Sequence, residues 1–140
     1  MGEGTFIDLL AFLEEYAKDE PTKRLLYLAR LDEARHVAYG QEHIKNSIKS
    51  NPHKIELLKE CVFARRHSLD EINAESSLLI EALSVFAGGS TESNAYKKGF
   101  EMVEILKAKM HTNRTQRLVN CGIDEDLAVD LSKAHTPNFM

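Results

Sequence analysis

A long helical pattern, running from Glu20-Pro21 to about Ser50, constrains this chain more than any other feature of its sequence. Proline suits the first turn of a helix, because the amide hydrogen that it lacks would have no partner there. From that start the helical spacing continues without interruption to Ser50, which corresponds to a rod of roughly 45 Å. We therefore expect a fold built on long helices.

One face of this predicted helix is apolar except at two positions, Glu33 and His36. Three residues of α-helix turn through roughly 300°, so the two side chains project from the same side and could hold one metal ion together. A carboxylate and an imidazole that face a core are costly unless they are paired, hydrogen-bonded or bound to metal. The spacing therefore predicts an inward-facing metal site, with iron as the first candidate. The other positions of the face are Leu26, Ala29, Val37, Gly40, Ile44 and Ser47 with Ile48.

Composition excludes several classes of protein. The 140 residues are one domain's length, and 43% hydrophobic with 29% charged residues is typical of a soluble globular protein, so we treat 1–140 as a single domain. A net charge of −4 and the lack of a Lys/Arg cluster argue against binding to nucleic acid. No apolar run approaches the roughly 20 residues that span a bilayer, and the start lacks the features of a signal peptide, so we expect a cytoplasmic location without membrane contact. The basic segment 113–117 is expected to be solvated or to pack against the tail rather than to bind an anion.

Local signals divide the chain into about five helices. Thr5 with Asp8 indicates a capping box, and Asn51-Pro52 and Asp124 indicate further helix starts. Gly88-Gly89 and Gly122 indicate helix ends. The expected helices span 5–18, 20–50, 52–87, 90–122 and a last one from 124. No strand is predicted. Because the connections are short, the sequence predicts an all-α, antiparallel up-and-down helical bundle with two long central helices.

The segment Asp32-Glu33-Ala34-Arg35-His36 resembles the Asp-Glu-x-Arg-His motif of the ferritin-like di-iron carboxylate proteins, in the branch of the oxygenases and ribonucleotide-reductase small subunits. This five-residue form on a long helix is considerably more specific than Glu-x-x-His alone. The end of the chain resembles the C-terminal end of larger bacterial ferritin-like proteins, at Arg114, Arg117-Leu118, Gly122-Ile123, Ala128, Leu131-Ser132 and 135–140. The resemblance covers nearly the whole chain, as the last portion of a longer family member.

The resemblance implies that Glu33 and His36 are ligands to iron, with manganese as a possible substitute, and that the protein is a metal-dependent oxidoreductase or oxygenase. It also implies that Asp32 accepts a hydrogen bond from a ligand histidine of the opposite half-site. The family site needs two Glu-x-x-His motifs and two further acids. This chain has one motif, because none of its other histidines has an acid three residues earlier.

Three sources could complete the site. The chain could be a C-terminal fragment whose other ligands lie upstream, or two chains could each contribute Glu33 and His36 across a two-fold axis. Alternatively, the chain could supply further ligands itself, and counting equal rises back from Asn51 puts Asp70 and Glu71 level with Glu33, with Glu71 the better candidate. His111 lies near the same height. Asp8 is level as well, but its expected capping role accounts for it.

A metal-free alternative stays open. The chain could be a catalytically silent helical fragment or interaction module, or, less favoured, a ligand-binding all-α domain. Whether or not metal is bound, the first predicted helix is too short to cover the second, so an apolar strip of the second helix is expected to be exposed. Such strips seldom stay exposed on a monomer, so we expect a homodimer or a higher homo-oligomer. The substrate is not specified by the sequence.

Overall fold

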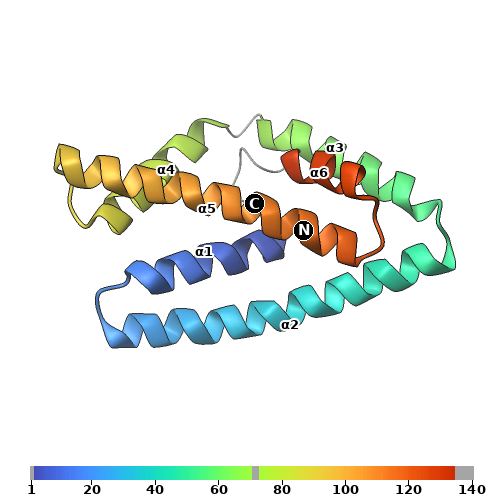
Figure 1. The fold of residues 1–140 in the computed structure, drawn as a ribbon, viewed down its shortest axis with the longest axis horizontal. Coiled ribbons are helices and arrows are strands. Elements are labelled where there is room, and N and C mark those ends of the chain that lie inside the picture. Colours follow the sequence, from blue (N-terminus) through green and yellow to red (C-terminus); the bar gives the residue numbers. More distant parts are fainter. Residues whose placement is uncertain (1, 71–72, 135–140) are drawn as a thin grey trace.

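The chain folds into helices throughout the part that the structure describes. The structure, a computed structural model, describes the backbone of residues 2–70 and 73–134 and the side chains of 4–66 and 77–134. No strand occurs in these residues, as the sequence predicts. The helices, coloured along the chain in Figure 1, are α1 (Gly2–Tyr16), α2 (Glu20–Ser50), α3 (Lys54–Asp70), α4 (Asn73–Gly88), α5 (Ser93–Asn120) and α6 (Glu125–Lys133).

Most helix ends coincide with signals in the sequence. Asp19 caps α2 by accepting a hydrogen bond from the Thr22 amide at 2.8 Å, and this bond lowers the pKa of the Asp19 carboxyl. Gly89 and Gly122 follow α4 and α5 with φ angles of 79° and 90°, a left-handed conformation that costs glycine little. Asp124 caps α6 as predicted, because its side chain accepts hydrogen bonds from two amides of the first turn.

The predicted capping box at the start of the chain is wrong. Helix α1 is already formed at Gly2, so Thr5 and Asp8 lie within it. Both side chains are buried, and they accept hydrogen bonds from side chains of α5 instead of capping α1. The reason lies in the tertiary structure: Asn113 and Arg114 of α5 donate hydrogen bonds to these side chains, and a local sequence pattern does not show such distant partners.

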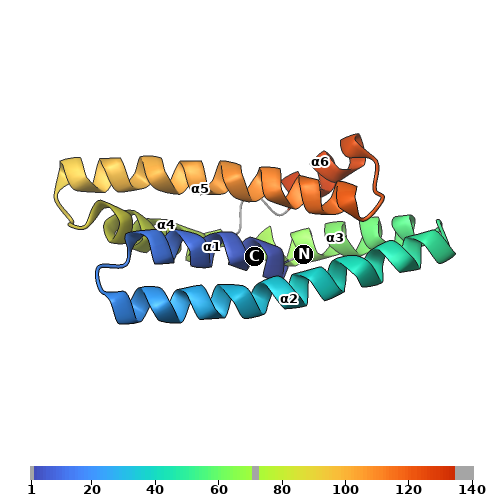
Figure 2. The same cartoon turned by 60° about the horizontal axis from the view of Figure 1, so that its bottom comes forward.

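The helices form a bundle around α5. Figure 2 shows α1 and α2 as one antiparallel pair, and α4 and α5 as another. Helix α5 contacts α1, α2, α4 and α6, and it contributes to both hydrophobic cores of the molecule. One core joins α1, α4 and α5 through Phe12, Leu83, Val103, Leu106 and Met110. The other core lies at the α3 and α6 end and comprises Val62, Leu118, Ile123, Ala128, Leu131 and Ala134.

Helix α2 lies at the outside of the bundle, although the sequence predicts a central position for two long helices. None of its 31 residues is buried, so of the two longest helices only α5 is central. Large apolar side chains of α2 are exposed, with Leu25 67% and Tyr39 77% accessible. Neither α2 nor any other described helix combines the length and low polarity needed to cross a membrane.

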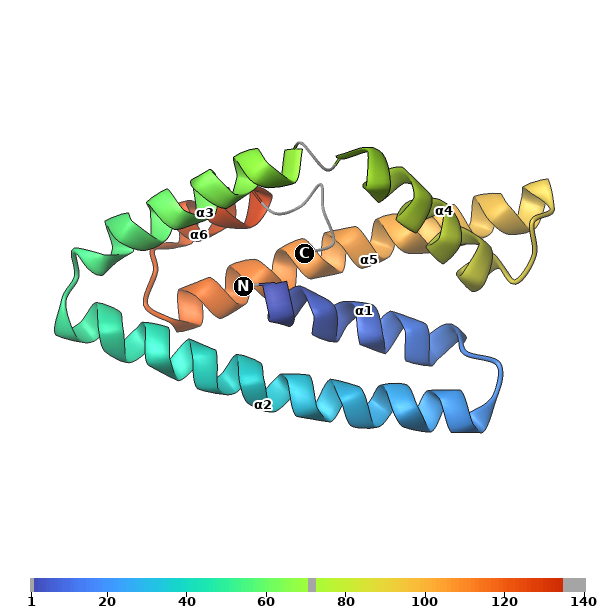
Figure 3. The same ribbon diagram turned by 180° about the vertical axis from the view of Figure 1, so that it is seen from behind.

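The predicted helix over 52–87 is wrong, because the structure contains two helices in that range. Helices α3 and α4 run at an angle to each other, as Figure 3 shows from behind. Helix α3 contacts α2 and α6, whereas α4 contacts α5 and α1. The segment 54–87 contains neither proline nor glycine, so the strongest helix-breaking residues, which would have indicated two helices in the sequence, are absent from it.

Helices α4 and α5 approach each other closely through small residues. A Cβ atom at Gly99 would clash with the backbone of Ser84 and Gly88, and a Cβ atom at Gly88 would clash with the carbonyl oxygen of Ala95. Because glycine has no side chain, the backbones of the two helices can touch at Gly88 and Gly99. The pairing of α4 with α5 is the most extensive one between helices of the described chain.

Candidate functional site

The predicted metal ligands lie together on α2, but they differ in environment. Oε2 of Glu33 lies 3.7 Å from Nδ1 of His36, which is longer than a hydrogen bond. The Glu33 side chain is 25% exposed, and its Oε2 atom is completely buried without a hydrogen-bond partner. The His36 side chain is 65% exposed. The predicted inward orientation is therefore found for Glu33 and not for His36.

The residue predicted to support the site faces solvent. Asp32 is 70% exposed and accepts a hydrogen bond at 2.9 Å from Nη1 of Arg35, one turn along the same helix. No histidine is within hydrogen-bond distance of it among the described residues. Asp32 and Arg35 thus form a surface ion pair in this chain.

The other candidate ligands do not complete the pair. Glu71 lies outside the described residues, as does the side chain of Asp70. His111 is engaged elsewhere, with its Nδ1 atom 2.8 Å from the hydroxyl of Ser132 on α6. Asp8 is bonded to α5. Within the described residues no group of three or more His, Cys, Asp or Glu side chains could hold a metal ion.

A buried polar cluster, which sequence reasoning missed, joins α1, α5 and α6. Its centre is Arg114, whose guanidinium donates to Thr5 Oγ1 at 2.9 Å and to the Ser132 carbonyl at 2.8 Å. Arg114 is only 3% exposed, and burial, followed by the nearby Arg117, lowers its pKa to about 10, while Asp8 opposes this. Of the two expectations for 113–117, packing against the tail helix therefore holds for Arg114 and solvation does not.

A sequence signal for this cluster existed. Arg114 follows Met110 by four residues and precedes Leu118 by four, so it continues the apolar face of α5. A charged residue at such a position is buried unless the face ends there. The helical spacing of Val103, Leu106 and Met110 continues to Arg114 one turn later, so the apolar pattern of α5 points to Arg114.

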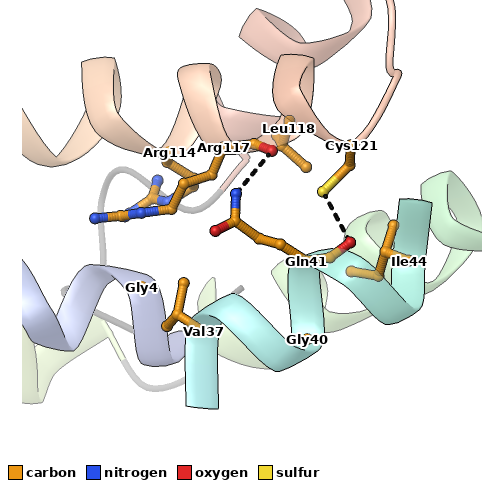
Figure 4. Close-up of a pocket in the computed structure, with 9 residues that line it drawn as sticks. All are labelled: Gly4, Val37, Gly40, Gln41, Ile44, Arg114, Arg117, Leu118 and Cys121. Carbon is orange, nitrogen blue, oxygen red and sulfur yellow. Dashed lines mark hydrogen bonds between the residues drawn. The ribbon is translucent and has the colours of Figure 1, made fainter. Parts of the chain in front are cut away.

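Asp8 connects the cluster to a second arginine. Its carboxylate accepts hydrogen bonds from Asn113 at 2.7 Å and from Nη2 of Arg117 at 3.2 Å. The Nη1 atom of Arg117 is buried and has no partner. Figure 4 shows the two guanidinium groups side by side next to the first turn of α1, at the edge of a cavity between α2 and α5.

Comparison with known proteins gives no further guide. No protein-family model, no curated protein and no solved structure matches the chain. The assignment of a function therefore depends on the residues and their geometry.

Proposed function

We propose that this chain supplies half of a two-metal carboxylate centre of the ferritin-like type, in which Glu33 and His36 bind one iron or manganese ion. The observation that carries the proposal is the buried, unpartnered Oε2 atom of Glu33, which faces Nδ1 of His36 at 3.7 Å. A carboxylate oxygen that is removed from water without a hydrogen bond is costly. A metal cation would offset this cost.

Glu33 and His36 fit a metal ion in chemical type and do not complete its ligand shell. Carboxylate oxygen and neutral imidazole nitrogen are both common ligands of iron and manganese. The remaining donors would come from Glu71, from a second copy of the chain, or from a preceding segment of a longer protein. A second copy packed along α2 would also cover the exposed apolar side chains of that helix.

The chemistry of such a centre defines the proposed class of activity. When bound, a pair of iron ions would supply oxygen reduction coupled to oxidation of an organic substrate or of the metal itself. In this chain Glu33 would contribute negative charge from a half-buried position, and His36 a neutral nitrogen at the surface of α2. The proposed function is accordingly that of a metal-dependent oxidoreductase or oxygenase subunit.

The test is an anaerobic titration of the metal-free protein with ferrous iron, combined with thermal melting. We expect iron to raise the melting temperature, since ligand at a hundredfold excess over its dissociation constant adds about 2.7 kcal/mol of stability. Glu33→Gln should abolish this iron-dependent gain. Without iron the same substitution should leave stability unchanged or raise it, because it removes an unpaired charge from a half-buried position.

Glu42→Gln is the matched control. Glu42 lies on the same helix and also has a basic partner one turn later, Lys45, at 3.6 Å, but its side chain is well exposed. This variant should respond to iron like the parent protein. A parent melting temperature that does not depend on iron would refute the proposed metal function.

A second candidate function is a metal-free interaction module. It is favoured by the exposed apolar residues of α2 together with the lack of a three-donor cluster in the described chain. The iron titration distinguishes the two candidate functions, because only the metal centre predicts a melting temperature that depends on iron. An iron-independent protein that nevertheless self-associates through α2 would support the interaction module.

A further inference from the structure

The outer face of α2 carries a regular stripe of exposed side chains, which we call the outer stripe. Its members recur at alternate steps of three and four residues, which keeps them within a band of roughly 100° around the helix. All of them are exposed, and Figure 2 shows α2 along one edge of the bundle. The outer stripe consists of Leu25, Leu28, Asp32, Arg35, Tyr39 and Glu42.

The apolar members of the outer stripe form a row along the helix. Leu25 is 67%, Leu28 45% and Tyr39 77% accessible. Single exposed apolar side chains are ordinary on a protein surface, but a row of large ones on one face marks a surface that packs against a partner.

The centre of the outer stripe is an ion pair aligned with the helix. Nη1 of Arg35 donates to Oδ1 of Asp32 at 2.9 Å, so the negative end of the pair points toward the N-terminus of α2. A second α2 helix packed in the same direction would set like charges against each other. One packed in the opposite direction sets each carboxylate against a guanidinium, which is favourable. The charge pattern therefore fits an antiparallel copy of the same helix.

We propose that two copies of the chain pair through the outer stripe as antiparallel α2 helices, with Asp32 of each copy facing Arg35 of the other. Because positions run in opposite directions along antiparallel helices, this register also sets Leu28 of each copy opposite Tyr39 of the other. Each member of the outer stripe thus meets another member, as the interface of a two-fold dimer requires. The four central charges would fix the register, as polar positions do in coiled coils.

The charges also disfavour the neighbouring registers. The stripes next coincide when one helix slides by a heptad. A slide in one direction sets Asp32 against Glu42, which places like charges together. A slide in the other direction sets Leu28 against Asp32, which places an apolar side chain against a charge. Only the proposed register pairs opposite charges and apolar side chains at the same time.

Cysteine cross-linking tests orientation and register together. In a Cys61→Ser background, which lacks the exposed native thiol, the double variant Leu28→Cys with Tyr39→Cys should form a disulfide-linked dimer under mild oxidation. The two positions lie about 16 Å apart along one helix, too far for a disulfide within a chain. Non-reducing electrophoresis measures the rate of linkage.

Two control variants separate the alternatives. Leu28→Cys with Asn46→Cys corresponds to a slide of one heptad and should link at least ten times more slowly. Leu28→Cys alone should also link slowly, because only parallel helices would bring position 28 next to its own copy. Fast linkage of the single variant, or equal rates for the two double variants, would refute the proposed pairing.

A charge exchange tests the central ion pairs without new thiols. In sedimentation, Asp32→Arg should weaken the dimer at least tenfold, because positive charges alone would then meet at the two-fold axis. Adding Arg35→Asp to this variant should restore the dimer. A single variant that associates like the parent protein, or an exchange variant that stays dissociated, would overturn the proposal. Neither experiment uses metal, so the iron titration of Glu33 decides the proposed metal function separately.

Discussion

At the scale of single residues, two aspartate–arginine pairs of similar length have very different surroundings. Asp8 and Arg117 meet at 3.2 Å in the interior, whereas Asp32 and Arg35 meet at 2.9 Å on the surface. An exposed pair contributes about 0–1 kcal/mol, because water and salt screen it and the side chains lose freedom. Loss of one partner from a buried pair leaves an uncompensated charge, which is a much larger cost.

This contrast gives a prediction for two matched substitutions. Asp8→Asn should reduce the free energy of unfolding by about 3 kcal/mol, because the buried Arg114 and the partly buried Arg117 would then have no carboxylate. Asp32→Asn should change it by less than about 1 kcal/mol. Urea denaturation followed by circular dichroism measures both values. Similar small effects of the two substitutions would show that the polar cluster is not a buried ionic network.

The position of Arg114 shows that a basic segment does not by itself predict a solvent-exposed surface. The basic segment 113–117 reads as a solvated surface when its residues are taken together. Taken by helical position, Arg114 belongs to the buried face of α5 and Arg117 follows it by three residues, so both approach α1. Helical position is therefore the better guide than local charge density at this site.

At the scale of helices, contact between α4 and α5 depends on residues without side chains. Gly99 is buried at the crossing, and the neighbouring backbone of Ser84 leaves no space for a methyl group. Glycine within a helix normally costs up to about 1 kcal/mol relative to alanine. The close packing of the two helices offsets this cost at Gly99.

Two glycine-to-alanine substitutions should therefore have opposite signs. Gly99→Ala should lower the free energy of unfolding by about 1–3 kcal/mol, because the helices must move apart. Gly40→Ala on α2 should raise it by up to about 1 kcal/mol, since its Cβ atom would meet no atom within 4 Å. Thermal and urea denaturation of the two variants measure these changes. Stabilisation by Gly99→Ala would mean that α4 and α5 do not pack as closely as described.

At the scale of the molecule, the outer position of α2 is the main unexplained feature. Helix α2 packs against α1, but none of its 31 residues is buried, so one of its faces stays open to solvent. Its exposed Leu25 and Tyr39 lie on the helix that carries Glu33 and His36. Covering α2 with a second copy would bury these apolar side chains and bring a second Glu33–His36 pair to the interface.

We therefore predict self-association through α2. Sedimentation at micromolar concentration should give a dimer or a larger assembly. The double substitution Leu25→Glu with Tyr39→Glu should shift it toward monomer by at least tenfold in dissociation constant. Ile105→Glu, at a position of α5 that is also 68% exposed, is the control and should leave association unchanged. A parent protein that sediments as a monomer would contradict the proposed interface.

The helical class and most helix ends follow from signals that are local in the sequence. Pro21, Gly89, Gly122 and Asp124 act through their own backbone or side-chain chemistry, which needs no distant partner, so their effects are readable locally. The sequence also placed Glu33 and His36 on one side of a long helix, because helical spacing alone decides that relation.

The way in which these helices share their cores depends on tertiary contacts. Helices α3 and α4, which divide the range 52–87, have different packing partners, and the burial of Asp8 and Arg114 follows from the meeting of α1 with α5. The exposure of His36 likewise depends on what covers α2, which no periodicity within α2 encodes. Burial and partner choice are properties of contacts between distant segments, and a local pattern predicts them only when one packing arrangement is possible.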